Sequence, residues 1–371
     1  MPKANAPSEL WIALLGRRDI PADGIADYCA HLQQALEPHG VALQLARVEW
    51  SDGGWLAALR NLSRESKNWR DKWVILQYTA LAWSQRGFPI GALLSVAILR
   101  LRGARCAVLF HEPWGTTGPR RIDRIRCTFQ NWTLRTLHRF ARKSIFTAPL
   151  NSVPWLSRVP EHSAFIPLGP NIPENLTNRS ATRNQNGLRK TVVVFCVSEP
   201  PYRQREIGEI SHAVRFAAAE GIPLRVVFIG RGTSEAKAEI DRAFHGTQIE
   251  VCNRGLCNAA EVTRIFGESD AMLAVRGRLY LRRGSALAGL ACGLPIVGYA
   301  GAAQGTVIEE AGIALVPFGD AEALGAALCN VLTNPELWRE MHEKNLRIQQ
   351  RVFSWNVIAA SYIEFLAGTR A

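Results

Sequence analysis

One stretch organises the predicted fold: Arg282-Arg283-Gly284-Ser285-Ala-Leu-Ala-Gly-Leu-Ala-Cys-Gly293-Leu-Pro295-Ile-Val-Gly298. It predicts a short helix that begins at Gly284 and Ser285, is stopped by a glycine and a proline, and leads into a buried strand. The first N–H groups of a helix lack partners and carry the positive end of its dipole, so they attract anions. Arg282 and Arg283 add fork-shaped donors suited to phosphate oxygens. We therefore expect a phosphorylated ligand here; the alternative is ordinary helix-to-strand packing beside two solvated arginines.

Length and composition limit the class of protein. At 371 residues the chain exceeds the size at which one hydrophobic core usually stops growing, so we expect two domains. Its 47% apolar residues are too many for a disordered chain. The formal net charge of +12 favours an anionic partner, such as a phosphorylated substrate or an anionic membrane. Nucleic acid is not expected as a partner, because the sequence holds no recognised nucleic-acid module.

The cysteines and the N-terminus indicate a cytoplasmic protein. The eight cysteines show no Cys-x-x-Cys spacing, so neither a zinc site nor a redox motif is expected. The first residues lack the order of charge, apolar run and cleavage site that marks a signal peptide. One long uncharged run, 286–308, contains several glycines and a proline, and its pattern indicates protein interior rather than a membrane span.

The first half of the chain alternates between predicted strands and helices. Strand, glycine-containing loop, helix and strand over 10–45 predict the opening of a Rossmann-like βαβ unit. Gly24 lies at the end of that loop and is a candidate for close ligand approach; a plain turn glycine is the alternative. A later strand over 106–110 places His111 at its carboxyl end, where ligands bind in open α/β sheets. His111 is therefore a candidate for chemistry, with a purely structural histidine as the alternative.

Residues 119–143 form a basic amphipathic segment. Eight Lys or Arg residues stand against a single acid, Asp123. The apolar residues interleaved with them are Ile122, Ile125, Phe129, Trp132, Leu134, Leu137 and Phe140. Such a helix can lie on an anionic membrane with Trp and Phe at the interface. The alternative is a solvated helix whose apolar stripe packs on its own sheet.

The second half begins after a predicted linker over 171–190, which is rich in Asn, Arg, Ser and Thr. Strands and helices then alternate again, which implies a second parallel sheet covered on both faces. A loop that carries Arg203 and Arg205 follows the first of these strands. Gly230-Arg-Gly232 follows the next strand and precedes a helix expected over 234–244, but the third glycine of a dinucleotide motif is missing.

Four motifs follow one another towards the C-terminus. They are Ala288-Gly-Leu-Ala-Cys-Gly-Leu-Pro-Ile-Val297, Gly312-Ile-Ala-Leu-Val-Pro-Phe-Gly-Asp320, Leu332-Thr-Asn-Pro-Glu-Leu337 and Phe353-Ser-Trp355. With two Rossmann-like halves before them, they resemble the retaining GT-B glycosyltransferases of the family-4 (glycosyl transferases group 1) type. The resemblance implies an α/β fold of the GT-B kind, with two Rossmann-like domains facing across a cleft and a C-terminal helix that crosses back.

The resemblance implies transfer of a sugar from a nucleotide-sugar to a saccharide or lipid-linked acceptor with retained configuration, in surface polysaccharide or glycolipid assembly. It implies an acceptor domain over 1–170, the linker over 171–190, a donor domain over 191–352, and a helix over 353–371 that packs back on the first domain. Family members usually need no metal ion, so we expect neither a metal nor another cofactor. The protein would be cytoplasmic, with the inner face of the cell membrane as a candidate site of peripheral association.

The resemblance also suggests roles for residues. Donor-binding candidates lie at a helix start or in the loop before it; they are Gly24, Arg203, Arg205, Arg282, Arg283, Gly284 and Ser285. His111 would lie near the transferred sugar, and Arg205 would stabilise the leaving diphosphate, so these two are the catalytic candidates. Gly24 would let the backbone of the first domain approach the diphosphate.

The sequence departs from the family pattern at one place. Most members carry two glutamates with seven residues between them, and Tyr280 and Ala288 stand at those positions here. The Arg-Arg-Gly-Ser sequence resembles a bacterial polysaccharide-type subgroup that also lacks the pair. Glu309 is a further candidate for a polar contact with the donor. Two other interpretations stay open: a GT-B sugar-nucleotide epimerase or phosphorylase-like protein, and a catalytically inactive GT-B subunit that binds an active transferase through 119–143.

Overall fold

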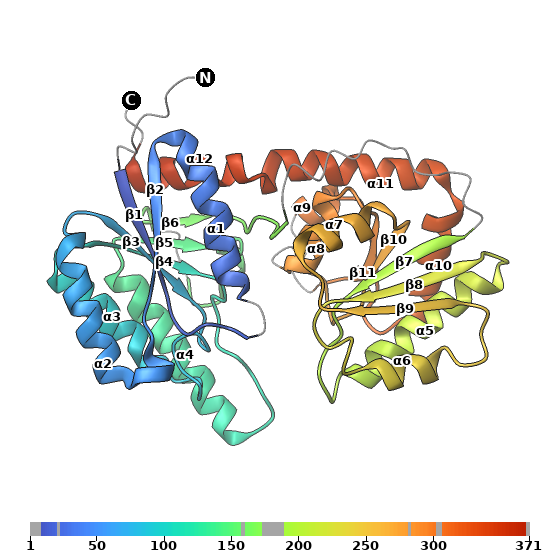
Figure 1. Ribbon diagram of the computed structural model, residues 1–371, viewed down its shortest axis with the longest axis horizontal. Helices are drawn as coiled ribbons and strands as arrows, with labels where there is room; N and C mark the ends of the chain where they lie inside the picture. Colours follow the sequence, from blue (N-terminus) through green and yellow to red (C-terminus); the bar gives the residue numbers. More distant parts are fainter. Residues whose placement is uncertain are drawn as a thin grey trace. The chain divides into compact units, whose positions relative to one another are not determined.

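The computed structural model describes residues 9–20, 23–156, 160–172, 189–280, 283–301 and 306–368. The chain divides into two units: unit 1 runs to Leu168 and resumes at Trp355, and unit 2 is Gly169–Ser354. Within the described residues each unit has one six-stranded sheet with helices on both faces, so the predicted α/β class is confirmed (Figure 1). Residues 173–188 of the predicted linker lie outside the described residues. No helix in the described parts of the chain is long and apolar enough to cross a membrane.

The sheet of unit 1 is parallel, in the order β2-β1-β3-β4-β5-β6. Its strands are β1 (Glu9–Leu15), β2 (Val41–Arg47), β3 (Trp73–Tyr78), β4 (Arg105–Phe110), β5 (Lys143–Phe146) and β6 (Ser163–Phe165). Its helices are α1 (Gly24–Leu36), α2 (Trp50–Glu65), α3 (Ile90–Leu101), α4 (Arg121–Phe140) and α12 (Trp355–Ala367), with short 3₁₀ turns at Glu37–His39, Ser66–Trp69 and Leu150–Ser152.

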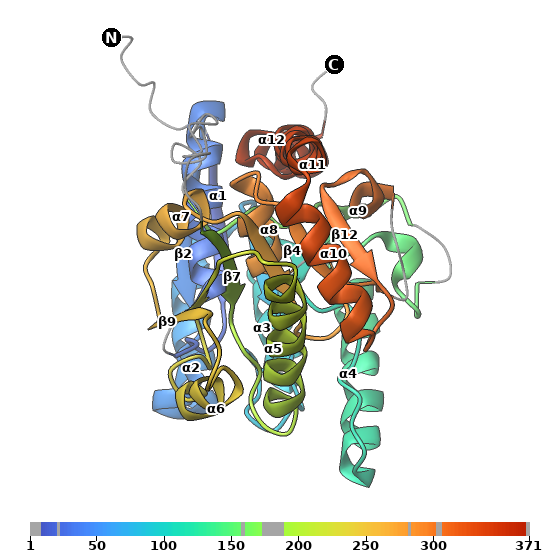
Figure 2. The ribbon, with the colours of Figure 1, turned by 90° about the vertical axis from the view of Figure 1, so that its right-hand side faces the viewer.

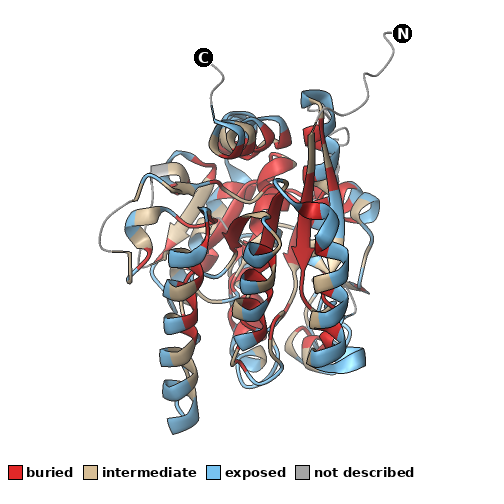
Figure 3. Cartoon of the chain, turned by 90° about the vertical axis from the view of Figure 1, so that its left-hand side faces the viewer, coloured by how far each residue is buried: buried red, intermediate tan, exposed pale blue. Residues whose placement is uncertain are grey.

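The side chains along the strands of unit 1 point alternately to the two faces of the sheet and form a hydrophobic core on each face. Because successive side chains of a strand point to opposite faces, Trp11 and Ala13 of β1 pack with α1 and α12, whereas Ile12 and Leu14 pack with α2, α3 and α4. The strands are buried and the outward sides of the helices are exposed (Figure 3). The predicted helix over 119–143 is confirmed as α4, but only its C-terminal half packs on the sheet.

The sheet of unit 2 is also parallel, in the order β12-β11-β10-β7-β8-β9. Its strands are β7 (Lys190–Phe195), β8 (Leu224–Ile229), β9 (Glu250–Gly255), β10 (Ala271–Ala274), β11 (Ile296–Tyr299) and β12 (Ile313–Val316). Its helices are α5 (Arg203–Ala219), α6 (Lys237–Ala243), α7 (Ala259–Gly267), α8 (Gly284–Ala291), α9 (Thr306–Glu310), α10 (Ala321–Thr333) and α11 (Pro335–Ile348), followed by a π-helical turn at Gln349–Phe353.

The Gly230-Arg-Gly232 segment serves the packing of the protein itself. A Cβ atom on Gly232 would lie 2.2 Å from the carbonyl oxygen of Val197, and the φ of Gly232 is +80°. The glycine therefore allows the end of β8 to approach the loop after β7, in a backbone region that favours glycine. The helix that follows is α6 and begins at Lys237, three residues later than the sequence suggested, because a turn occupies 234–236.

Candidate functional site

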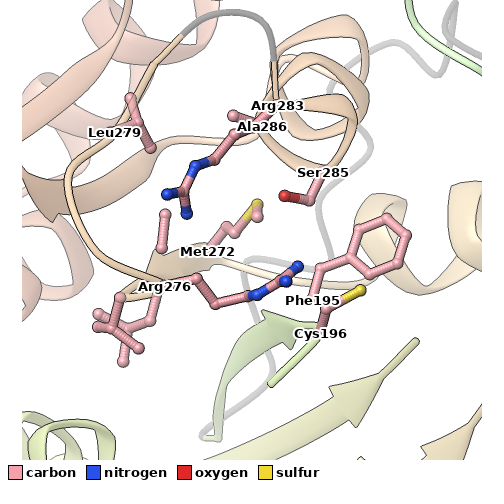
Figure 4. Close-up of a pocket in the computed structure, with 11 residues that line it drawn as sticks. Phe195, Cys196, Met272, Arg276, Leu279, Arg283, Ser285 and Ala286 are labelled. Atoms are coloured by element: carbon pink, nitrogen blue, oxygen red, sulfur yellow. The ribbon is translucent and has the colours of Figure 1, made fainter. Parts of the chain in front are cut away.

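A pocket lies in unit 2 between β7 and β10, where the order of the strands in the sheet reverses. From β7 the chain runs to α5 on one face, and from β10, the neighbour of β7, it runs to α8 on the other. Ligands of open α/β sheets bind at such a point, beyond the carboxyl ends of the strands. The pocket is lined by Phe195, Cys196, Met272, Leu273, Ala274, Val275, Arg276, Leu279, Arg283, Ser285 and Ala286 (Figure 4).

Alternation along β7 and β10 explains why the pocket opens on the side of α8. Val194 and Leu273 belong to the core shared with α5 and α10. Their neighbours Phe195 and Met272 point to the other face of the sheet. The ring centre of Phe195 lies 5.7 Å from that of Phe266 in α7. The sulfur of Met272 lies beside α8, since a Cβ atom on Gly289 would be 3.0 Å from it. The pocket therefore sits among β7, β10 and the start of α8.

Two guanidinium groups extend into this pocket. Arg276 is the second residue after β10, and Arg283 occupies the position before the first residue of α8 (Figure 4). The Nε of Arg276 donates to the Oγ of Ser198 at 3.5 Å, which ties it to the loop after β7. With the hydroxyl of Ser285 and the N–H groups that a helix start leaves without intrahelical partners, they form an arrangement suited to phosphate oxygens.

Gly284 begins α8, as the sequence predicts. A Cβ atom built on it would meet no atom of the described residues within 4 Å. Packing inside the protein therefore does not require glycine at this position, and there is open space beside the helix start. Arg282, the other arginine of the predicted anion site, lies outside the described residues.

Arg203 and Arg205 lie in the first turn of α5, rather than in the loop before it. The side chain of Arg203 is 11% exposed: its Nε donates to the carbonyl oxygen of Ser198 at 3.2 Å, and its Nη1 lies 3.7 Å from a carboxylate oxygen of Glu239. Arg203 thus holds the loop after β7 against α6. Neither arginine is among the residues that line the pocket.

Arg205 is more open than Arg203, with 42% of its side chain exposed. Its guanidinium carbon lies 5.2 Å from the ring centre of Phe318, and its Nε lies 3.5 Å from Oε1 of Glu209. Burial raises the pKa of the Glu209 carboxyl, and the charge of Arg205 opposes that rise. Arg205 is therefore held beside the carboxyl ends of the strands by a ring and a carboxylate.

Arg276 and Arg278 are the site residues that the sequence reasoning missed. Arg276 lines the pocket, and the guanidinium carbon of Arg278 lies 5.1 Å from the same Phe318 ring that Arg205 contacts. A signal was present: both arginines lie in the loop at the carboxyl end of β10, the kind of position that singled out His111.

In unit 1, His111 follows β4 at the carboxyl edge of the sheet. Its Nε2 lies 2.9 Å from Oε1 of Gln77, and the Tyr28 ring meets it edge-on with the ring centres 5.6 Å apart. Burial lowers the pKa of His111 to about 4, so the imidazole is neutral at pH 7. If the Gln77 oxygen accepts from Nε2, then Nδ1 is the ring's acceptor.

Gly24 is brought to the same edge of unit 1 as His111. It is the first residue of α1, and the helix is capped by Asp23, whose carboxylate accepts from the N–H of Ala26 at 3.1 Å. Arg47 fixes this cap, because its Nη2 lies 2.8 Å from the other oxygen of Asp23. Tyr28, one turn further along α1, carries the ring that contacts His111.

The remaining candidates lie apart from the pocket. Glu309 is exposed on α9 and is not among the lining residues, so its predicted contact with the donor stays a prediction. At the positions of the family's glutamates, Tyr280 is partly buried and Ala288 is 3% exposed inside α8. The expectation that no metal or other cofactor takes part also stays a prediction.

Comparison with solved structures identifies the fold. No protein-family model matches the chain, and neither does any curated protein. HepE from Anabaena, solved in complex with UDP and glucose, is 14% identical with a TM-score of 0.67, over 97% of this chain and 99% of that one. Sucrose-phosphate synthase from Thermosynechococcus elongatus is 18% identical with a TM-score of 0.67, over 97% and 100%. A putative UDP-N-acetylglucosamine 2-epimerase from Listeria monocytogenes is 11% identical with a TM-score of 0.63, over 97% of each chain.

These likenesses, at low identity and nearly full coverage, show that the chain has the GT-B fold that the sequence predicts. Each of its two units is a Rossmann-like domain, and α12 returns to pack on unit 1.

Proposed function

We propose that the protein is a glycosyltransferase that moves a sugar from a nucleotide-sugar to a saccharide or lipid-linked acceptor. One observation carries the proposal: Arg276, Arg283 and Ser285 converge with the start of α8 at the switch point of unit 2. Two guanidinium groups and a helix N-terminus suit a diphosphate, which carries two adjacent anionic groups. The fold shared with HepE, whose structure contains UDP and glucose, supports a nucleotide-sugar as the source of that diphosphate.

The arginines would act on the leaving group. When the bond between sugar and diphosphate breaks, negative charge grows on a phosphate oxygen, and positive groups held in place beforehand stabilise that charge most effectively. Ser198 helps to fix two arginines. Its hydroxyl accepts from Nε of Arg276, and its backbone carbonyl accepts from Nε of Arg203. We infer that Arg205 and Arg283 also contact the diphosphate and that the open space beside Gly284 admits it.

His111 would bind the sugar. A neutral imidazole held by Gln77 accepts or donates a hydrogen bond without bringing a charge, which suits a sugar hydroxyl. We further infer, from the family resemblance, that the reaction retains the sugar's configuration, needs no metal ion, and serves surface polysaccharide or glycolipid assembly.

Thermal-shift titration tests the proposal. UDP, GDP, ADP and their sugars are titrated against the wild type and against Arg276→Ala, Arg283→Ala and Arg339→Ala. Arg339 is an exposed arginine of α11 away from the pocket and serves as the matched control. We expect at least one nucleotide to stabilise the wild type, and each pocket variant to weaken its affinity about tenfold or more, because a charged hydrogen bond is lost. The proposal fails if no nucleotide stabilises the protein, or if the three variants bind equally.

A second candidate function is epimerisation of the nucleotide-sugar. The likeness to a putative UDP-N-acetylglucosamine 2-epimerase and the residues Tyr280 and Ala288 at the glutamate positions favour it. Proton NMR of the bound nucleotide's sugar, without acceptor, separates the two. A changed configuration in the free donor supports the epimerase, whereas turnover only with an acceptor supports the transferase. Binding without either reaction supports the inactive subunit.

A further inference from the structure

The N-terminal half of α4 protrudes from unit 1. Helix α4 starts beyond the carboxyl edge of the sheet and runs back along it, so its first turns extend past the strands (Figure 2). The buried residues of α4 are Gln130, Thr133, Leu134 and Leu137, so burial begins only at the middle of the helix. The first half is held by the segments before it: Gln130 donates to the carbonyl oxygen of Gly87 at 3.0 Å and accepts from the N–H of Thr116 at 2.7 Å, and Phe129 meets Phe88 with ring centres 5.4 Å apart.

An apolar stripe runs along the open side of this helix. It consists of Ile122, which is 40% exposed, Ile125, which is 59% exposed, and Trp132, which is 52% exposed; the partly buried Phe129 lies between them and packs on Phe88. At 3.6 residues per turn these positions fall within about 80° of the helix circumference and extend over about 15 Å. Exposed large apolar side chains in such a continuous line mark a surface that contacts something apolar.

An arginine row borders the apolar stripe. It consists of Arg121, Arg124, Arg135 and Arg139, all exposed and within about 60° of the circumference. The single acid of the helix, Asp123, is turned away from this row: it accepts from Arg126 Nη1 at 2.9 Å and from the N–H of Arg120. The open side of α4 thus presents apolar and cationic groups, with no acidic side chain from the helix itself.

We propose that α4 docks unit 1 on an anionic lipid surface. A helix lying in a membrane interface buries aromatic and aliphatic side chains among the acyl chains and sets basic side chains against the lipid phosphates. The apolar stripe and arginine row have this arrangement. A stable contact with a folded protein would call for a broader surface than one row of side chains.

This docking would place the membrane at the carboxyl edge of the unit 1 sheet, where His111 lies. His111 directly follows β4, so the protruding end of α4 and His111 lie at the same carboxyl edge of the unit 1 sheet. For a lipid-linked acceptor, which rests on the proposed function, the membrane would present the acceptor next to the candidate sugar-binding residue. The docking itself needs no nucleotide.

Vesicle sedimentation without nucleotide tests the proposal. The full chain is mixed with vesicles of phosphatidylcholine plus phosphatidylglycerol, or of phosphatidylcholine alone. We expect binding to the anionic vesicles that weakens as salt is added, because salt screens the arginine row. The variant Arg124→Glu/Arg135→Glu is expected to lower the partition coefficient at least about twentyfold. The variant Ile125→Glu/Trp132→Glu is expected to lower it at least about tenfold.

A matched control lies on another helix of the same unit. Leu56 and Arg60 of α2 are exposed, so Leu56→Glu/Arg60→Glu makes the same kinds of change away from α4 and should leave binding unchanged. All substituted side chains are exposed, and equal melting temperatures confirm that the variants fold. The proposal is overturned if the wild type does not sediment with anionic vesicles, if the α4 variants sediment as well as the control, or if α4 proves to bind a protein and no lipid. Because the assay contains no nucleotide, its outcome is separate from that of the nucleotide titration.

Discussion

The hydroxyl oxygens of Tyr28 and Tyr362 lie 3.0 Å apart, although 334 residues separate them in the sequence. Both side chains are buried, and burial raises the pKa of each hydroxyl, so both stay neutral. The pair ties α12 to α1 one turn after Gly24, and the ring of Tyr28 also contacts His111. The last helix of the chain therefore supports the candidate site of the first unit.

Removing one of the paired hydroxyls should destabilise unit 1. In Tyr362→Phe the hydroxyl of Tyr28 stays buried without its partner, and we expect the free energy of unfolding to fall by about 1–3 kcal/mol. Ser361→Ala is the control, because Ser361 is not fully buried and its hydroxyl donates to the carbonyl oxygen of Val357 in its own helix. Urea unfolding of both variants measures the difference, and equal stabilities would contradict the role of the pair.

The partly buried His111 should make stability depend on pH. Its pKa is about 4 in the folded protein and 6.5 in the reference state. Between these values the unfolded chain takes up a proton that the folded state does not, so the free energy of unfolding falls as the pH drops from about 6.5 towards 4. His111→Gln removes this contribution, whereas His138, whose pKa is also lowered to about 4, titrates in both proteins. The free energy of unfolding, measured at several pH values, should fall more in the wild type than in His111→Gln across this range; equal falls would refute the assignment.

The two glycines Gly232 and Gly221 allow steric clash to be separated from backbone strain. Both have a positive φ, +80° and +78°, but a Cβ on Gly232 would strike the carbonyl of Val197, whereas one on Gly221 would meet nothing within 4 Å. We expect Gly221→Ala to cost about 1 kcal/mol from strain alone. Gly232→Ala should cost clearly more and disturb the loop after β7. Chemical denaturation measures both, and similar losses would show that the close approach to Val197 does not matter.

Arg203 and Arg205 should respond differently to truncation. Arg203→Ala removes a mostly buried side chain that bonds the Ser198 carbonyl, and should lower the free energy of unfolding by about 1 kcal/mol. Arg205→Ala removes a half-exposed side chain and should change stability by less than about 0.5 kcal/mol, while weakening nucleotide binding under the proposed function. Thermal unfolding and nucleotide titration of both variants check this. A large loss of stability in Arg205→Ala alone would reverse the two roles.

Local patterns made many of the elements predictable. The run Thr191–Val197 reads as a buried strand, and the structure has β7 at Lys190–Phe195; Gly284 begins α8 as expected. These predictions succeed because apolar periodicity and a glycine stop are local properties of the chain. The helix α2 was missed, since it contains Gly53 and Gly54, and Gly54 has a non-helical backbone, with φ 76° and ψ 163°.

Helix α4 shows a property that the local sequence pattern does not determine, namely which of its apolar side chains are buried. Its sequence predicts an amphipathic helix, and both packing on the sheet and a free surface were compatible with that pattern. In the structure Leu134 and Leu137 are buried, while Ile125 and Trp132 are exposed. Ile125 is exposed because the first turns of α4 extend past the strands, and Trp132 is exposed because it lies on the side of the helix opposite Leu134. How far the sheet extends along a helix cannot be read from the sequence of that helix.

The sequence by itself determined the repeated alternation of strands and helices, the glycine-started helix at 284, and the basic character of 119–143, because each depends on neighbouring residues. Only the tertiary structure decided which side chains meet. Phe195 and Cys196 share a pocket with Arg276 and Arg283 because β7 and β10 are neighbours in the sheet, and Tyr28 meets Tyr362 because α12 returns to unit 1. Such pairings follow from the order of strands and the packing of helices, which hydrophobic contacts across the whole chain select together.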